Sequence, residues 1–458
     1  MSIDTDNENK SAVLPVNFTG ITGRGKTDVD VPAQIGPTSS LNEILIFARS
    51  KNASDVHIGA LKPIILRQYS RLVTVTSEIL TADHISHLIR AGIPKNVLDH
   101  FEKTGDAEYV HTINGYGRFR MAIMKERNGS DLTARVIPME IPTFENSGMP
   151  ASCAGLTKWS QGMVLITGPA GCGKTTSLAV LIEMINQARH EHILSIEEPI
   201  EIVFEPKQCQ ITQREINLHS LSQTKALRAA LREDPDILVV SELRDLNTIQ
   251  LAVTAAETGH LVFGTMNTVD AAQTVSRIID SFPAEEQSIV RNMISESLRG
   301  VICQQLIPKK DGTGMIPAFE VMIVTPSVSN LIRTNKIPQI NNAITTGKNI
   351  GMVLLDNSLE TLANKGHIAT AEACDRASNP ANMLQSISHM TLPRVRFLET
   401  GSDNDKILKD LILFGILEEV SQTEVRIKPT AEYLNEDTVR KIARADFDKI
   451  WALLQQIA

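Results

Sequence analysis

The amino-acid sequence predicts an α/β protein with an N-terminal α+β domain, a doubly wound α/β domain and a small C-terminal α+β extension. Its 458 residues allow for several domains at roughly 100–200 residues each. Segments with alternating apolar residues before residue 138 indicate strands, two of them joined in a hairpin, and so an α+β domain. Four continuous apolar runs between residues 163 and 265, separated by helical text, indicate parallel strands that are buried on both faces.

Composition excludes several classes of protein. The chain has 45 Lys plus Arg against 53 Asp plus Glu, a net charge of −8, so we expect no nucleic-acid partner. No apolar run approaches the ~18 residues that a membrane span needs, and Met1–Asp6 lacks the apolar core of a signal peptide. The five cysteines form no CxxC pair, which disfavours a zinc ribbon or a disulfide framework and fits a reducing cytosol.

The first half of the chain divides into three predicted parts. Residues 1–38 lack hydrophobic periodicity and are expected to form a disordered leader. Residues 39–138 form the α+β domain, with a helix from Leu41 that Ser39 or Ser40 caps. Its predicted strands are 55–58, 64–67, 71–75, 107–113 and 116–124, the last two joined by a hairpin turn at Asn114-Gly115. Residues 139–155 are expected to form a linker, because the stretch Pro138–Pro150 carries three prolines.

The second half carries the doubly wound domain, residues 156–380, and then the extension, residues 381–458. The four parallel strands are predicted at 163–167, 192–196, 237–240 and 261–265, and mostly helical text follows from 270 to about 380. In the extension, residues 407–414 and 439–454 suggest helices and residues 425–428 a strand, a pattern similar to a small winged-helix module of unknown role.

Residues 168–175, GPAGCGKT, match the phosphate-loop pattern GxxxxGK[ST] between a predicted strand and a predicted helix. Glycines let successive backbone N–H groups face a phosphate, and the helix N-terminus adds partial positive charge. We expect Lys174 to bridge the β- and γ-phosphates of ATP and Thr175 to bind Mg²⁺. The predicted nucleotide-binding residues are Gly168, Pro169, Ala170, Gly171, Cys172, Gly173, Lys174, Thr175 and Thr176.

Acidic residues follow two of the predicted parallel strands, at the sheet edge where ligands bind in such folds. Glu242 ends the run Ile237–Ser241 and is the candidate carboxylate that orients water for hydrolysis. Glu197 and Glu198 follow the strand that ends at Ile196, and they are predicted to hold Mg²⁺ or its waters. The alternative for this second pair is a merely solvated turn.

These motifs resemble the secretion ATPase superfamily and, within it, the pilus-retraction (twitching-motility) ATPases of the PilT type. Four elements over residues 40–380 carry the resemblance: Ala53–Ile58 with the N-terminal "ASDLHL" element, Ile196–Glu201 with the aspartate box, Ala229–Asp245 with the Walker B region and Ala255–Val262 with the histidine box. Ser329–Arg333 with Lys336 is similar to the AIRNLIREGK motif of retraction motors, and the four-cysteine zinc element of many assembly motors is absent.

The resemblance implies a PAS-like N-terminal domain, a RecA-like ATPase domain and the cofactors ATP and Mg²⁺. It also implies a homohexameric ring in which arginines reach the nucleotide of the adjacent subunit. Arg118-Phe119-Arg120 matches the family's RFR text and Arg135 its later arginine, whereas Arg127 is equally explained as a solvated cation, and His57 as a satisfied histidine. The implied catalytic set is Glu242, Lys174, Glu201, His260, Arg118, Arg120 and Arg135.

Three positions depart from the family pattern. Asn267 replaces the second histidine of the histidine box, Ser241 replaces the Walker B glycine, and Glu198 replaces the aspartate of the aspartate box. Asn267 is a neutral amide that cannot titrate. The resemblance as a whole implies ATP-driven pilus retraction as the function. The protein is expected in the cytoplasm at the inner-membrane pilus base, where a platform protein and the pilus machinery hold it at the membrane periphery. A slow or non-hydrolysing regulator of the motor and a secretion or pilus-assembly ATPase remain alternatives.

Overall fold

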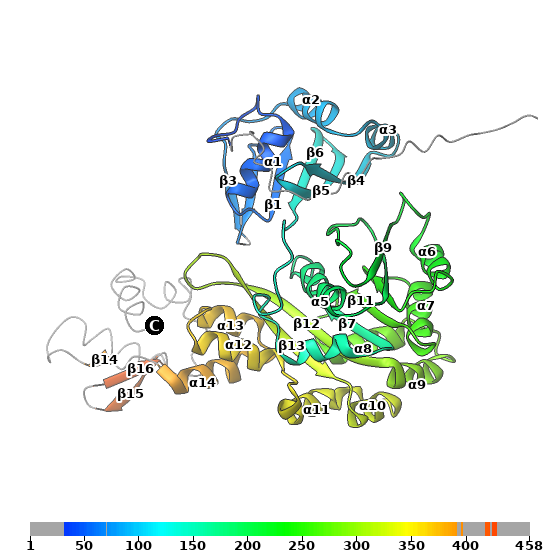
Figure 1. Ribbon diagram of the computed structural model, residues 1–458. Coiled ribbons are helices and arrows are strands. Elements are labelled where there is room, and N and C mark those ends of the chain that lie inside the picture. The colour runs from blue at the N-terminus through cyan, green and yellow to red at the C-terminus, as the bar shows by residue number, and fades with distance from the viewer. Residues whose placement is uncertain (1–31, 70, 392–394, 397–416, 422–423, 428–458) are drawn as a thin grey trace, which may run out of the picture.

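The computed structural model describes residues 32–69, 71–391, 395–396, 417–421 and 424–427. An antiparallel-sheet domain, blue to cyan in Figure 1, lies above a larger α/β domain coloured green to yellow. The strands of the first domain are β1 (Asp55–Gly59), β2 (Ile65–Gln68), β3 (Arg71–Thr74), β4 (Asp106–Ile113), β5 (Gly117–Glu126) and β6 (Gly129–Val136). Its helices are α1 (Leu41–Ser50), α2 (Ala82–Gly92) and α3 (Lys95–Thr104).

The six strands of the N-terminal domain pair antiparallel in the order β3-β2-β1-β6-β5-β4. Apolar side chains of α1, α2 and α3 pack with those of the sheet in one core that includes Ile44, Ile85 and Phe119. The predicted α+β domain is confirmed, and the PAS-like detail stays a prediction. Ile35 packs against the same core, so the folded part begins before residue 39.

Local sequence signals explain two elements of this domain. The Ser40 hydroxyl accepts the Glu43 amide and the Glu43 carboxylate accepts the Ser40 amide, a capping box that starts α1 as predicted. The Asn114-Gly115 turn joins β4 and β5, with Gly115 at φ 78°. Strand β6 and helices α2 and α3 were not predicted.

The α/β domain is built on a seven-stranded sheet. Its strands are β7 (Gly162–Thr167), β8 (His192–Glu197), β9 (Gln210–Glu215), β10 (Ile237–Val240), β11 (Leu261–Met266), β12 (Leu298–Pro308) and β13 (Met315–Ile323). They lie in the order β13-β12-β7-β11-β10-β8-β9, and only the pair β12–β13 among these is antiparallel. The four predicted parallel strands are β7, β8, β10 and β11.

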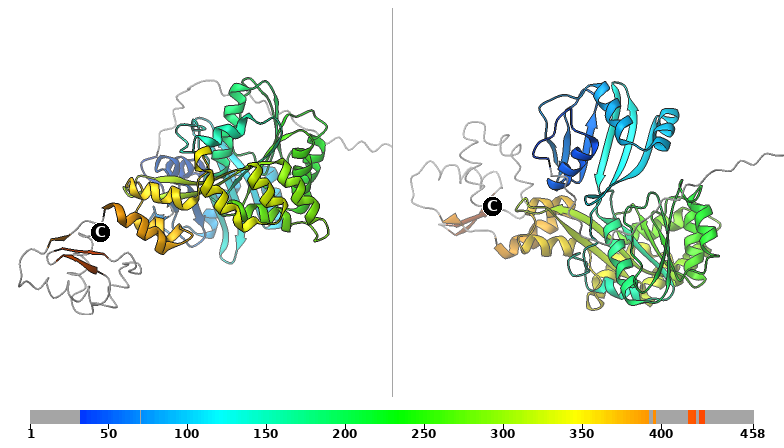
Figure 2. Two further views of the ribbon diagram at one scale, coloured as in Figure 1. Left: turned by 90° about the horizontal axis from the view of Figure 1, so that it is seen from below. Right: turned by 45° about the horizontal axis from the view of Figure 1, so that its top comes forward.

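Helices cover both faces of this sheet (Figures 1 and 2). The helices of this part are α4 (Ser152–Gly155), α5 (Lys174–Ala188), α6 (Gln223–Ala230), α7 (Leu246–Glu257), α8 (Ala271–Asp280), α9 (Gln287–Ser297), α10 (Pro326–Arg333), α11 (Ile340–Thr346), α12 (Leu355–Asn364), α13 (Thr370–Arg376) and α14 (Pro380–Thr391), with short 3₁₀ turns at Leu156–Lys158, Ile337–Gln339 and Gly347–Ile350. Val164 and Ile166 pack on the α5 side, and Met163 and Leu165 on the side of α6 to α9. This double burial explains the continuous apolar runs.

The interpretation of residues 270–380 as mostly helical is wrong for β12 and β13. Polar residues such as Gln304 and Gln305 interrupt the apolar run of β12, which weakens the strand signal, yet Gln304 is buried. At the predicted boundaries, Met149 and Cys153 of the expected linker are buried in the core on the α5 side. Met383 of α14 likewise packs with α12 and α13, beyond residue 380.

The described part of the extension holds three short strands, β14 (Val395–Arg396), β15 (Leu417–Ser421) and β16 (Glu424–Ile427). They form one small sheet in the order β14-β16-β15, and β16 coincides with the predicted strand at 425–428. The predicted helices at 407–414 and 439–454, and the leader up to residue 31, lie outside the described residues. No helix within the described ranges is both long and apolar enough to cross a membrane.

Candidate nucleotide site

Three loops converge at one edge of the seven-stranded sheet. The phosphate loop follows β7, and Asn267 comes directly after β11. Glu242 follows β10 after one intervening residue, Ser241. The three strands are parallel neighbours in the order β7-β11-β10. The carboxyl ends of neighbouring parallel strands meet at the same edge. The fold therefore brings the predicted Lys174 and Glu242 together and sets Asn267 between them.

The phosphate loop needs its glycines for both conformation and space. Gly168, Gly171 and Gly173 have φ of 143°, 76° and 91°, a region that other residues rarely adopt. A Cβ on Gly168 would lie 2.2 Å from the backbone oxygen of Gln304 on β12. Pro169, Ala170 and Gly171 are exposed at the tip of the loop, and the following helix α5 begins at Lys174. This geometry suits a phosphate at a helix N-terminus.

Gln304 holds the loop from the neighbouring strand. Its side chain is buried, its Nε2 donates to the Cys172 carbonyl at 2.7 Å, and its Oε1 accepts the Ser177 hydroxyl at 2.5 Å. One amide thus ties the loop to the first turns of α5. The sequence analysis missed this residue, because the strand that carries it was interpreted as helical.

The Lys174 ammonium makes three hydrogen bonds in the described structure. It donates to the carbonyls of Gly168 and Pro169 at 2.7 and 3.0 Å and to Asn267 Oδ1 at 2.8 Å. Burial is the main cause that lowers the pKa of Lys174 below its ordinary value, and the charge of Arg135 acts in the same direction. An anionic phosphate would offset both effects by favouring the charged ammonium.

Both oxygens of the Glu242 carboxylate are engaged. Asn267 Nδ2 donates to Oε1 at 2.6 Å, and Arg244 pairs with Oε2 at 2.7 Å. The hydrogen bond to Glu242 raises the pKa of Arg244. Asn267 therefore links the cation of the phosphate loop to the candidate catalytic carboxylate through one neutral amide.

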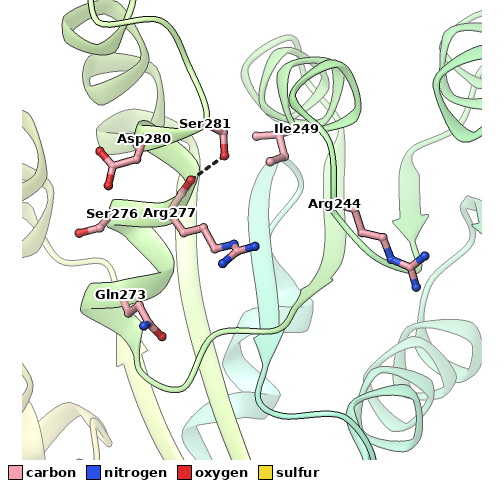
Figure 3. Close-up of a pocket in the computed structure, with 7 residues that line it drawn as sticks. All are labelled: Arg244, Ile249, Gln273, Ser276, Arg277, Asp280 and Ser281. Carbon is pink, nitrogen blue, oxygen red and sulfur yellow. Dashed lines mark hydrogen bonds between the residues drawn. The ribbon is translucent and has the colours of Figure 1, made fainter.

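A pocket of about 360 Å³ lies beside this carboxylate, between the start of α7 and helix α8. Figure 3 shows its lining, in which Arg277 reaches toward the space between the two helices and Arg244 lies at the far side. Ser281 caps the end of α8 by donating to the Arg277 carbonyl at 2.7 Å. Of the predicted site residues none lines this pocket, so it is a neighbour of the site and not the site itself.

The residues predicted to bind Mg²⁺ differ in how well they fit a cation. Thr175 is half-buried in the first turn of α5, and its hydroxyl makes no hydrogen bond within the described part of the chain, which suits a ligand. Glu197 is buried and accepts Ser195 and Gln213 at 2.7 and 2.9 Å. Burial raises the pKa of Glu197, which disfavours a charged ligand there.

Glu198 is exposed and accepts the Asn217 side-chain amide at 3.3 Å, so it stays a candidate for Mg²⁺ or its waters. In the described residues no group of three or more His, Cys, Asp or Glu side chains forms a metal cage. Phosphate-loop proteins hold Mg²⁺ largely through the nucleotide and water, so a full protein cage is not required.

Two of the predicted arginines, Arg118 and Arg120, contact the α/β domain of their own chain. Arg118 Nη2 donates to the Ile200 carbonyl at 2.7 Å, and Arg120 donates to Glu201 at 3.2 Å and to Glu108 at 3.1 Å. Burial lowers the pKa of Arg118, whereas Glu108 and Glu201 together outweigh burial and raise that of Arg120. These contacts lie within one chain, and the expectation that the arginines reach the nucleotide of a neighbouring subunit stays a prediction. Glu201 pairs with Arg120 in this structure.

His260 is not brought to the site. It precedes β11, and its carbonyl accepts the Gly162 amide at the start of β7. The phosphate loop lies at the other end of these strands, roughly 20 Å away for six residues of strand. His260 Nδ1 lies 3.1 Å from the Ala255 carbonyl, which indicates a local structural role. The structure thus places His260 away from the phosphate loop of its own chain, and its catalytic role stays a prediction.

Sequence reasoning also missed the roles of Arg244 and Asp55. Arg244 stands two residues after Glu242 in the quoted Walker B text, and that spacing was the available signal. Asp55 is buried and accepts Arg135 Nε at 2.9 Å, a pairing that becomes visible only with the strand register. His57 Nε2 is buried without a hydrogen-bond partner in the described part, and burial lowers its pKa.

A phosphate loop between a buried parallel strand and a helix, with a carboxylate at the end of a neighbouring strand, defines a P-loop nucleotide-binding protein with a doubly wound core. The chain belongs to the family described as Type II/IV secretion system protein, whose model matches residues 36–390.

Named relatives narrow the comparison. The chain is 42% identical over 342 residues to the Pseudomonas aeruginosa type IV pilus retraction ATPase PilT, covering 75% of this chain and 99% of that protein. It is 42% identical over 304 residues to a twitching motility protein of Neisseria gonorrhoeae, covering 66% and 81%. A crystal structure of the pilus retraction motor PilT with bound ADP aligns with TM-score 0.67 and 36% identity, over 75% of this chain and 98% of that one.

Proposed function

We propose that this protein is an ATPase that drives type IV pilus retraction, the removal of pilin subunits from a pilus. The proposal of ATP hydrolysis depends on one observation. The Asn267 side chain bridges the phosphate-loop cation Lys174 and the candidate catalytic carboxylate Glu242 through two hydrogen bonds. The direction of the motor is supported by the relatives, which are described as a retraction ATPase and a twitching motility protein.

Each residue of the proposed site has a chemical role. The loop Gly168–Thr176 binds the phosphates, Lys174 neutralises the γ-phosphate, and Thr175 with the exposed Glu198 holds Mg²⁺ or its waters. Glu242 orients the attacking water and accepts its proton. Arg118, Arg120 and Arg135 offset the charge that develops on the phosphates, with Glu201 holding Arg120 in place. Bound Mg²⁺ supplies Lewis-acid stabilisation of the phosphate oxygens.

The working unit in this proposal is a homohexameric ring in the cytoplasm at the inner-membrane pilus base, in contact with the pilus platform protein. The proposed parts are the leader 1–38, the arginine-bearing domain 39–138, the segment 139–155, the ATPase domain 156–380 and the extension 381–458. Ile35 packs against the core of the arginine-bearing domain, and Met149 and Met383 pack in the cores of the α/β part.

One observation favours a second candidate, a slow or non-hydrolysing regulator of a pilus motor. Glu242 is engaged on both oxygens, by Arg244 and by the amide of Asn267, and neither an arginine nor an amide loses its donor near neutral pH. Purified protein with Mg²⁺ and ATP separates the two candidates. Steady phosphate release, together with restored twitching in a bacterium whose own retraction ATPase is deleted, supports the motor; nucleotide binding without release and without restored twitching supports the regulator.

A further inference from the structure

Four charged residues line up across the sheet of the N-terminal domain. Asp55 on β1 lies directly opposite Arg67 on β2 and Arg135 on β6, and Arg135 lies opposite Arg120 on β5. Directly opposed residues of antiparallel strands project from the same face of a sheet. We call Arg67, Asp55, Arg135 and Arg120 the arginine row.

The arginine row ends against the α/β domain. Arg120 pairs with Glu201 in the loop after β8, at the sheet edge that carries the phosphate loop. Arg135 is near enough to Lys174 for the two charges to interact. The row thus reaches the proposed nucleotide site of its own chain at the Glu201 loop and near Lys174.

Arg120 and Arg135 are like charges in directly opposed positions, an arrangement that destabilises a sheet unless other charges offset it. Glu108 and Glu201 offset Arg120, with oxygens at 3.1 and 3.2 Å. The Asp55 carboxylate offsets the charge of Arg135 in the same way. Guanidinium groups on the same face of neighbouring strands are suited to binding phosphate oxygens.

Asp55 binds Arg135 through the Nε atom of the guanidinium group. Its Oδ1 accepts Arg135 Nε at 2.9 Å, and its Oδ2 lies 3.9 Å from Arg67 Nε. This is the one hydrogen bond that the Arg135 side chain makes to the described residues, so both of its terminal nitrogens are left for a ligand. Asp55 is 8% exposed, whereas the Arg135 side chain is 49% exposed, so a buried acid anchors a cation that solvent or a ligand can reach.

We propose that Asp55 is a positioning residue for ATP hydrolysis, which acts by holding Arg135 through Nε so that its two terminal nitrogens face the nucleotide phosphates. Arg67 completes the pair by balancing the second oxygen of Asp55. This inference rests on the proposed function and adds a residue to it.

A double-mutant cycle tests the proposal with Asp55→Asn, Arg135→Ala and the combined variant. Phosphate release and equilibrium binding of a non-hydrolysable ATP analogue are measured for each. We expect Asp55→Asn to lower kcat/KM by about 10-fold or more and Arg135→Ala by about 100-fold, with no further loss in the combined variant, since Asp55 acts through Arg135. Asp55→Glu, which keeps the charge, should recover part of the loss.

The matched control is Asp131→Asn. Asp131 makes an ion pair with Lys62 at 2.8 Å in the same sheet, opposite Gly59 at the other end of β1. We expect it to leave kcat/KM unchanged. Asp55→Asn kinetics equal to those of Asp131→Asn, or losses from Asp55→Asn and Arg135→Ala that multiply, would overturn the proposal.

Failure of the proposed function and failure of a variant to fold can each be distinguished from failure of this proposal. If the wild-type protein binds the analogue but releases no phosphate, the proposed function fails, and the same cycle on binding still tests Asp55, with non-additive losses expected. If Asp55→Asn does not fold, as judged by thermal melting, Asp55→Glu replaces it in the cycle. An Asp55→Glu loss that multiplies with that of Arg135→Ala then counts against the proposal.

Discussion

The phosphate loop takes its ligand-facing residues from the continuous stretch 168–176, whereas the arginine row takes four residues from four different strands. The loop is fixed by local conformation and by Gln304. The row is fixed by strand register and by ion pairs of side chains that are partly exposed. The loop owes its shape to backbone conformation, whereas a row of long side chains loses rotamer freedom when it is held by partners such as Asp55 and Glu201.

The largest effect is expected on the phosphate-loop side. Lys174→Ala removes the cation that faces the γ-phosphate, so we expect phosphate release to fall by roughly 10²–10³-fold. Lys365→Ala, an exposed lysine after α12, is the charge-matched control and should retain activity. Nucleotide binding and phosphate release that are unchanged in Lys174→Ala would remove the phosphate-loop assignment.

The arginine side gives the next effect, and it distinguishes action within one chain from action between subunits. Because Arg118 and Arg120 contact the 200–201 loop of their own chain, we expect mixed preparations of Arg120→Ala and Glu242→Gln subunits to stay inactive. Each site in such a ring would carry one of the two defects. Recovery of phosphate release, with subunit exchange demonstrated by labelled protein, would show that these arginines serve a neighbouring site.

Gln304 tests how the loop is held. Gln304→Ala leaves the Ser177 hydroxyl and the Cys172 carbonyl without their buried partner, so we expect the free energy of unfolding to fall by about 1–3 kcal/mol. Nucleotide affinity should fall with it. Gln305→Ala, on the next residue of β12 and half-buried, is the control. Equal denaturant midpoints for the two variants would contradict this role of Gln304.

Asn267 gives the smallest and most specific effect. An amide does not titrate, so wild-type kcat should change little between about pH 6 and 8. An unperturbed histidine titrates near pH ~6.5. At this place the Lys174 ammonium would lower the pKa of the imidazole and the Glu242 carboxylate would raise it, so the two effects oppose each other. We therefore expect Asn267→His to gain a pH-dependent limb in this range. The same pH–rate profile for both proteins would reduce Asn267 to a packing residue.

Short-range signals accounted for the elements that were predicted correctly. The capping box of Ser40 and Glu43, the Asn114-Gly115 turn and the phosphate loop each depend on residues close together in the chain. Glu242 was found because the end of a buried strand marks the ligand edge.

The remaining features depend on strand register and sheet order, which local patterns do not contain. His260 belongs to a motif that spans β11, and its distance from the site follows from which end of the strand it occupies. Gln304 is a polar residue inside a strand, so its text resembles an amphipathic helix. The pairing of Asp55 with Arg135 joins residues 80 positions apart.

The most direct test of the account is phosphate release from Mg²⁺–ATP by the wild-type protein and by Glu242→Gln, with binding of the ATP analogue measured in parallel. Glutamine has nearly the same size as glutamate, although its neutral amide binds Arg244 less strongly than the carboxylate does. The amide cannot accept the proton of the attacking water. We predict steady release by the wild type and near-complete loss in Glu242→Gln, with analogue binding retained. Release by Glu242→Gln at the wild-type rate would contradict the central claim that this edge of the sheet is where ATP is hydrolysed.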